Sequence, residues 1–393
     1  MPLDPQTWFV IGFYAALVLL IIIFRKKFEF QAKFIALLKT KLGLSWMDKI
    51  AKKYPKLVRA LGYVGIWVGY IGMGVITYFI FYGLYILVTK PAAPATFAPV
   101  IPGVKIPGSP VFVPFWHGII AIFIVAAIHE FCHGVVARAH NIPVKSSGIV
   151  FFGPLIGAFV EPDDKVLNKK KPVVQNSMFA AGPFSNIILA VIIFALLSWV
   201  FAPATDALVE KQGFYFGEVR EGFPAYTAGL KNGTVYTFIN NQTINDSAGF
   251  IAALEGLKPN DTIIVGNENV TVTIIASASP DDPSKGYIGV WGIYTKYTLK
   301  NPDNMIGYAV LDWFTELFVW IFVLTLGIGL ANLLPLGALD GGRMFKIALL
   351  RKFDKKKTEA IFKAFSLVFI VFLILLLVPI FKAVGQSLIG WLA

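Results

Sequence analysis

The sequence predicts a polytopic α-helical membrane protein with about six transmembrane helices and an inserted small β-rich domain. Of its 393 residues, 56% are hydrophobic and only 15% are charged, and the mean hydropathy is +0.70, which excludes an ordinary soluble enzyme. The first apolar run has no basic residues before it and no small-residue cleavage site after it, so we expect a retained anchor. Runs long enough to cross a bilayer lie at about 8–24, 63–88, 115–137, 178–201, 308–335 and 364–392.

Most of the basic residues lie in alternate loops between these runs. Of the 35 Lys and Arg residues, 11 fall in 25–62, 6 in 138–172 and 8 in 343–363. The positive-inside rule therefore predicts that these loops are cytoplasmic. It places both termini and the loop 202–305 on the extracytoplasmic side of the cell membrane. The net charge of +12 is then a topology signal, so the expected environment is a lipid bilayer and no nucleic-acid partner is expected.

The N-terminal membrane region, residues 1–114, contains two of the predicted spans, joined by a basic loop. Within that loop, residues 28–60 interleave lysines with Phe, Leu and Trp. This pattern is typical of a basic amphipathic helix lying in the cytoplasmic headgroup region. A docking surface for a partner protein is an alternative role for the same residues.

The third predicted span, 115–137, contains the motif His129-Glu130-Phe131-Cys132-His133. Two histidines four residues apart lie on one helical face and can bind one metal ion. The adjacent Glu130 can then act as general base on a metal-activated water. Ionisable residues are costly inside a membrane, which favours a functional site over a structural histidine pair. Cys132 is the only cysteine, so no intrachain disulfide is possible, and we expect it to be a small buried apolar residue.

A catalytic zinc ion needs a third protein ligand. The fifth span is followed by Leu339-Asp340-Gly341-Gly342, in which the glycines let the backbone turn and approach closely. If the helices run as the topology predicts, Asp340 arrives at the cytoplasmic depth of the two histidines, and it is the predicted third ligand. The alternative is a helix-terminating turn in which Asp340 only faces water.

Three motifs in this order resemble those of the site-2 protease family of intramembrane zinc metalloproteases. They are the histidine motif, Gly-Pro-x-x-Asn at 182–186, and Asn-x-x-Pro-x-x-x-Leu-Asp-Gly at 332–341. The chain departs from the family where Pro-Leu-Gly at 335–337 replaces the usual Pro-x-Pro before the Leu-Asp-Gly. The resemblance covers the two parts of the expected catalytic core, 115–201 and 306–345, and a C-terminal region with a basic loop and the last span follows at 346–393.

The resemblance implies a metal centre and an activity. His129, His133 and Asp340 would bind Zn²⁺. Glu130 would be the catalytic general base and later the proton donor. The expected activity is that of a zinc metalloendopeptidase that cleaves within or near the transmembrane segments of membrane-tethered regulatory proteins, after another protease has trimmed them.

The resemblance also implies how the substrate is held. Asn186 and Asn332 would face the cleft and contact the substrate backbone, although hydrogen bonds between helices are an alternative role for both. The apolar segment 148–160 is too short to span and would be a membrane-dipping hairpin, with Gly153 and Gly157 beside the substrate. Its exposed edge would suit strand addition by a substrate helix that has unwound.

Residues 206–300 change in composition to short alternating runs rich in Asn, Thr and Gly, which predicts a small β-rich domain. The stretch 217–234 resembles a PDZ domain, which implies an extended peptide or a C-terminus as a possible ligand. Residues 212–216 would be either its carboxylate-binding turn or a plain strand. Five Asn-x-Ser/Thr sequons fall in this loop, which agrees with an extracytoplasmic location.

Two other functions compete with proteolysis. An ion transporter would use the His/Asp cluster for conduction, but it predicts repeat symmetry that the sequence does not display, and it gives Glu130 no role. A scaffold without catalytic activity would tolerate loss of a ligand, yet the whole motif set is present. Other membrane peptidases use a glutamate as the third ligand, and the sequence has no matching second motif for one.

Overall fold

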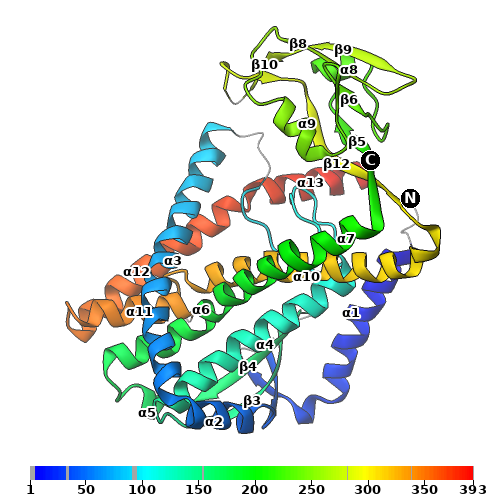
Figure 1. The fold of residues 1–393 in the computed structure, drawn as a ribbon. Helices are drawn as coiled ribbons and strands as arrows, with labels where there is room; N and C mark the ends of the chain where they lie inside the picture. Colours follow the sequence, from blue (N-terminus) through cyan, green and yellow to red (C-terminus); the bar gives the residue numbers. More distant parts are fainter. Residues whose placement is uncertain are drawn as a thin grey trace. The chain divides into compact units, whose positions relative to one another are not determined.

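The computed structural model describes residues 5–31, 35–90, 95–152, 155–280, 282–337 and 339–392. The chain forms two compact units, Met1–Leu197 with Phe314–Ala393, and Ser198–Trp313 (Figure 1). Among the described residues, six helices are long and apolar enough to cross a membrane, which confirms the six predicted spans. They are Gln6–Ile23, Pro55–Thr89, Phe115–Ala139, Pro172–Leu208, Pro302–Asn332 and Lys355–Ser387.

The helices that lie wholly or partly in the first unit are mostly these spans. Proline occupies the first turn of α3 and of α6, where a backbone N–H would have no intrahelical partner. The helices are α1 (Pro5–Ile23), α2 (Leu44–Lys53), α3 (Pro55–Thr89), α4 (Phe115–Ala139), α5 (Asp164–Leu167), α6 (Pro172–Leu196), α10 (Met305–Asn332), α11 (Asp340–Leu350), α12 (Lys355–Leu376) and α13 (Val378–Leu392), with a 3-10 turn at Arg25–Lys27.

Helix α3 packs closely against α6 and α11 through a row of glycines. A Cβ atom at Gly65 would lie 3.3 Å from the Phe184 ring of α6, and one at Gly69 would lie 2.8 Å from Met344 of α11. Lipid removes the hydrophobic drive between helices, so close contacts of this kind supply the packing. Tyr70 adds a hydrogen bond by donating to the Met344 carbonyl at 3.2 Å. The row therefore holds α6 and α11 against one support.

A four-stranded antiparallel sheet joins two distant parts of the first unit. Its order is β1-β2-β3-β4, with β1 (Glu29–Gln31), β2 (Ile35–Thr40), β3 (Val144–Phe152) and β4 (Leu155–Pro162). The prediction of an amphipathic helix over 28–60 is wrong for its first part, because the helix begins only at Leu44. Strand β2 pairs with β3 along its whole length, and this distant pairing overrides the local helical pattern.

Strand β4 forms one edge of this sheet, beside α4. The hairpin expected at 148–160 is present, and the described side chains at 156–162 are half-buried. The N–H of Val160 points away from β3, because it donates to Oε2 of Glu130 at 3.0 Å. Alternate residues of a strand present their backbone groups to the same side, so those of Ile156 and Ala158 also face the free edge.

The second unit is rich in β-structure, as predicted for 206–300, and has an aromatic core. Phe214, Phe216, Tyr236 and Phe250 pack together with exposures of 0–1%. Strand β12 pairs with β5, and a second sheet has the order β7-β6-β8-β9. The elements are α7 (Ala202–Leu208), β5 (Val209–Val219), α8 (Pro224–Thr227), β6 (Phe238–Ile239), β7 (Gln242–Thr243), α9 (Ser247–Ala253), β8 (Thr262–Gly266), β9 (Thr271–Ile275), β10 (Ser277–Ala278), β11 (Gly286–Tyr287) and β12 (Val290–Leu299), with a π-helical turn at Leu197–Phe201 and a 3-10 turn at Pro302–Asn304.

Residues 212–216 lie within a strand, with a bulge at Gln212, and do not form an open turn. They belong to β5, in which Phe214 lies opposite Thr295 and Phe216 opposite Ile293 of β12. Both phenylalanine rings are fully buried in the aromatic core. A paired strand with a buried face offers no open backbone loop for a carboxylate.

Helix α9 depends on one capping side chain, which gives a test of the second unit. Asp246 accepts hydrogen bonds from the backbone N–H of Gly249 at 2.7 Å and from Nζ of Lys211 at 2.9 Å. The Gly249 N–H, followed by Lys211, lowers the pKa of the Asp246 carboxyl. We expect Asp246→Ala to destabilise α9 by about 1 kcal/mol, seen as faster amide exchange at residues 249–253 of the full chain.

The pH dependence of this cap follows from the lowered pKa. The stabilisation is complete above the ordinary Asp pKa of about 3.9, and it is lost as the pH falls through the lower folded-state value. Asp246→Asn keeps an acceptor for Gly249 without the charge, so it should retain most of the protection and lose its pH dependence. Unchanged exchange in Asp246→Ala would contradict the capping role.

Candidate metal centre

Helix α4 brings the three ionisable residues of its motif to one place. One ligand atom each from His129, Glu130 and His133 lies within 4.8 Å of the others, and both histidines are buried. The spacing of four residues stacks the imidazoles one turn apart, with ring centroids separated by 4.8 Å. Both Nε2 atoms consequently face the same point beside the helix.

Asp340 reaches this point from a distant part of the chain. It is the first residue of α11, eight residues beyond the end of α10, and its side chain is 14% exposed. The turn requires glycine, because a Cβ at Gly341 would overlap the backbone carbonyl of Leu333, and one at Gly342 would lie 2.6 Å from the Leu336 oxygen. The structure therefore brings Asp340 into the histidine cluster, and not into a turn that only faces water.

The three predicted ligand atoms form a nearly equilateral triangle. Oδ2 of Asp340 lies 3.1 Å from Nε2 of His129 and 3.2 Å from Nε2 of His133, and the two Nε2 atoms are 3.2 Å apart. Ligand atoms of a tetrahedral zinc site with bonds of ~2.0–2.1 Å are separated by about 3.3 Å. Two imidazoles and one carboxylate are also a usual donor set for catalytic zinc. The residues present therefore fit a zinc ion.

Hydrogen bonds behind the imidazoles prepare both Nε2 atoms for a metal. Nδ1 of His133 donates to the Met178 carbonyl at 2.7 Å, which leaves its Nε2 with a free lone pair. Asn186 is 0% exposed, and its side-chain amide lies 3.1 Å from Nδ1 of His129. The amide atom nearest to Nδ1 is Nδ2, and Oδ1 has no partner. A half-turn of the amide exchanges the two atoms, so that Oδ1 accepts the Nδ1 proton of His129.

Helix α6 supplies these partners because it has no side chain at residue 182. A Cβ atom at Gly182 would lie 2.5 Å from Nε2 of His129, and closer still to Nε2 of His133. Helices α4 and α6 lie side by side in this region (Figure 1). The glycine of the Gly-Pro-x-x-Asn motif thus lets the α6 backbone reach the metal-binding edge of both rings.

Glu130 lies beside the ligands and is held by the sheet. Its Oε2 accepts a hydrogen bond from the N–H of Val160 in β4 at 3.0 Å. This bond holds the carboxylate beside the histidine cluster, to which Asp340 also contributes an oxygen 3.1 Å from Nε2 of His129. The arrangement can polarise a bound carbonyl at the metal and move a proton at Glu130.

The other predicted site residues lie in different places. Asn186 faces His129 and not open space, a position that suits an orienting group more than a substrate contact. Asn332 is half-buried at the end of α10. Gly157 lies in β4 opposite Val150, and Gly153 falls outside the described residues.

Sequence reasoning missed three groups of this centre. The carbonyl of Met178 and the N–H of Val160 are backbone groups, so the residue type gives no sign of their role. Gly182 was visible in its motif, but its closeness to the imidazoles depends on the crossing of two helices.

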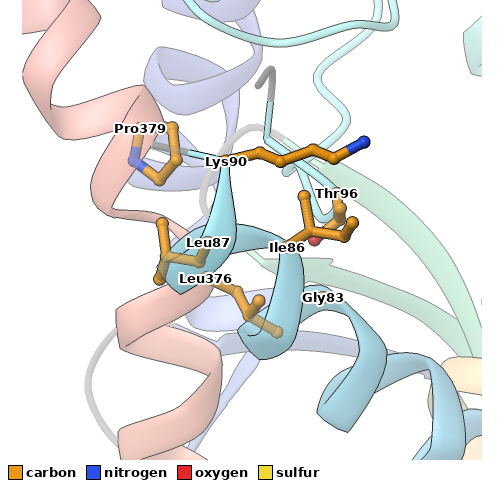
Figure 2. Close-up of a pocket in the computed structure, with 7 residues that line it drawn as sticks. All are labelled: Gly83, Ile86, Leu87, Lys90, Thr96, Leu376 and Pro379. Carbon is orange, nitrogen blue, oxygen red and sulfur yellow. The ribbon is translucent and has the colours of Figure 1, made fainter. Parts of the chain in front are cut away.

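A small cavity of about 10 Å³ between the end of α3 and the α12–α13 junction does not touch the centre (Figure 2).

The fold and the site define a polytopic membrane protein in which two histidines, one aspartate and an adjoining glutamate form a cluster that fits a metal ion. A family model described as Peptidase family M50 matches residues 117–377. The chain belongs to peptidase family M50, which confirms the resemblance to site-2 proteases. The metal of this family and of its named relatives is zinc.

Relatives extend over different shares of the chain. An uncharacterized protein of Methanocaldococcus jannaschii is 28% identical over 234 residues, which cover 58% of this chain and 56% of that protein. A Rickettsia conorii protein, provisionally named a zinc metalloprotease, is 24% identical over 348 residues, which cover 66% of this chain and 96% of that protein. The regulator of sigma-W protease RasP of Bacillus subtilis is 27% identical over 220 residues, which cover 44% of this chain and 50% of that protein. The chain thus spans about half the length of the first and third of these relatives.

The contact at Gly182 gives a test that needs no substrate. In Gly182→Ala the new methyl group would overlap both Nε2 atoms, so we expect zinc affinity to fall by about 10–100-fold or more. Metal per chain would be measured in detergent after dialysis against a graded chelator. Gly327→Ala is the matched control, because a Cβ there meets nothing within 4 Å. Zinc retained equally by both variants would show that α6 does not confine the site.

Proposed function

We propose that this chain is a zinc-dependent intramembrane endopeptidase that hydrolyses peptide bonds within or near transmembrane segments of other proteins. The observation that carries the proposal is the meeting of His129, His133 and Asp340 at 3.1–3.2 Å beside Glu130. The histidines and Glu130 lie on the apolar spanning helix α4. Ionisable groups at membrane depth are costly and mark functional sites. Family membership and the names of two relatives support hydrolysis of peptides.

The residues of the centre divide the chemistry among them. When bound, zinc supplies a Lewis acid that polarises the scissile carbonyl and makes water a better nucleophile near neutral pH. Glu130 takes the proton of the attacking water and returns it to the leaving amine nitrogen. The Val160 N–H orients the carboxylate for this transfer, and Met178 and Asn186 keep the imidazoles in place.

Strand β4 is the proposed binding edge for the substrate backbone. A transmembrane helix must unwind before hydrolysis, and its freed backbone groups then need new partners. The backbone groups of Ile156 and Ala158 point away from β3, and the Val160 N–H on the same side already donates to Glu130. A strand added along Ile156 and Ala158 would therefore end beside the metal centre. Strand addition supplies backbone hydrogen bonds whatever the substrate sequence.

The wider setting is proposed from the sequence pattern. Both termini and the second unit would be extracytoplasmic, with the metal centre toward the cytoplasmic side. The second unit, with its β-rich fold, would be a PDZ-like domain that binds an extended peptide or a C-terminus. The substrates would be membrane-tethered regulatory proteins already trimmed by another protease. The name of the Bacillus subtilis relative, a regulator of sigma-W protease, supports only the regulatory part of this proposal.

Replacing the general base separates proton transfer from metal binding. We expect Glu130→Gln to retain about one zinc per chain and to lose about 10²–10⁴-fold in cleavage rate, because Glu130 moves protons and does not bind the ion. Cleavage would be followed with single-span reporter proteins in proteoliposomes. Asp340→Ala is the contrasting variant and should lose zinc and cleavage together. Undiminished cleavage by Glu130→Gln would remove the general-base role.

Removing one donor from the edge of β4 tests substrate pairing. Ala158→Pro deletes an outward N–H and leaves the ladder with β3 intact, since proline is tolerated at edges. We expect KM to rise about two- to tenfold, the value of one hydrogen bond, with zinc content unchanged. Ala158→Val, which keeps the N–H, is the control. Equal KM values for the two variants would argue against strand addition at this edge.

A further inference from the structure

A second cavity of about 290 Å³ lies between α2, α3, α4 and α6, away from the metal ligands. Its walls include Tyr54 at the cap between α2 and α3, Leu57 of α3, Phe131 and Val135 of α4, and Ile188 of α6. This volume is near the lower end of small-molecule sites, about 300–1,000 Å³. The cavity is therefore large enough to hold part of a ligand.

The cavity suits an apolar occupant. Among its polar lining groups, the hydroxyl of Ser185 already donates to the Gly182 carbonyl at 2.7 Å. The thiol of Cys132 is only a weak hydrogen-bonding group. A hydrocarbon chain fills such a space at no cost in lost hydrogen bonds.

The cavity is separate from the proposed substrate edge. Cys132 lines it, and Glu130 faces β4 on the same helix. Residues two positions apart on a helix point about 200° apart. A molecule in this cavity consequently contacts the opposite side of α4 from a strand added to β4.

The mouth of the cavity carries positive charge. Ile50, Tyr54 and Leu57 line the cavity and are still 37–57% exposed, so it opens at the α2–α3 corner. Nζ of Lys53 lies 5.2 Å from the centroid of the Tyr54 ring. Helix α2 is an amphipathic basic helix with an exposed Trp46, a composition typical of the headgroup region of a bilayer.

We propose that this cavity is a binding site for an anionic phospholipid, with one acyl chain inside and the headgroup beside Lys53. The occupant would touch Cys132 and Ser185, which directly precede His133 and Asn186 in the sequence. A filled cavity supports the contact of α4 with α6 that presents the metal ligands. A bound lipid would thus contact residues that adjoin the metal-site residues on α4 and α6.

The only cysteine of the chain makes the test specific. Cys132 would be labelled with N-ethylmaleimide in the full-length protein, in nanodiscs of phosphatidylglycerol or of phosphatidylcholine with the same acyl chains, and followed by intact mass. We expect phosphatidylglycerol to slow labelling about fivefold or more relative to phosphatidylcholine. Lys53→Glu should abolish the difference. Lys52→Glu, which makes the same charge change about 200° around the helix from Ile50, should preserve it.

Each other outcome overturns the proposal. Equal labelling rates in the two lipids would mean that no anionic headgroup is selected. Loss of the difference in Lys52→Glu as well would assign it to surface charge and not to this site. Protection by a transmembrane peptide in phosphatidylcholine would make the cavity a helix-docking site. None of these readings depends on proteolysis, so the test stands apart from the proposed activity.

Discussion

The approach of α6 to the two metal-binding histidines is the contact on which the rest of the membrane unit depends. Because residue 182 lacks a side chain, the α6 backbone reaches the edges of both imidazoles. The same helix then offers the Met178 carbonyl to one ring and Asn186 to the other. Other elements keep α6 in place, among them the glycine row of α3 and Thr325 of α10, which donates to the Asn186 carbonyl at 3.3 Å.

This centre shows how polar chemistry is held where water is scarce. Each imidazole has a protein partner behind it, the ligand atoms face one another, and Glu130 has a backbone donor. In an apolar surrounding, groups without partners would cost several kcal/mol each. The same constraint applies to a substrate, whose helical hydrogen bonds must be exchanged before its carbonyl is reachable. In the proposed mechanism, the edge strand β4 next to Glu130 would supply that exchange.

Much of this could be predicted from the sequence, for identifiable reasons. Six spans follow from apolar length. His129 and His133 follow from their four-residue spacing on an apolar helix, and Asp340 from its place after the fifth span, directly before two glycines. The strand at 35–40 could not be predicted, because its partner β3 lies far along the chain and its own residues fit a basic amphipathic helix equally well. Backbone contributions such as the Val160 N–H are also invisible before the strand register is known.

The sheet beside Glu130 includes two strands that lie outside the part of the chain matched by the family model. The family match begins at residue 117, yet β1 and β2 precede it and cover the side of β3 that faces away from β4. Lys39 of β2 forms ion pairs with Glu29 of β1 at 2.7 Å and with Glu161 of β4 at 3.1 Å, so it links the two edge strands and reaches across β3. In a chain cut down to the matched residues, β3 would itself become an edge strand. An unwound helix could then pair with β3, on the side away from Glu130.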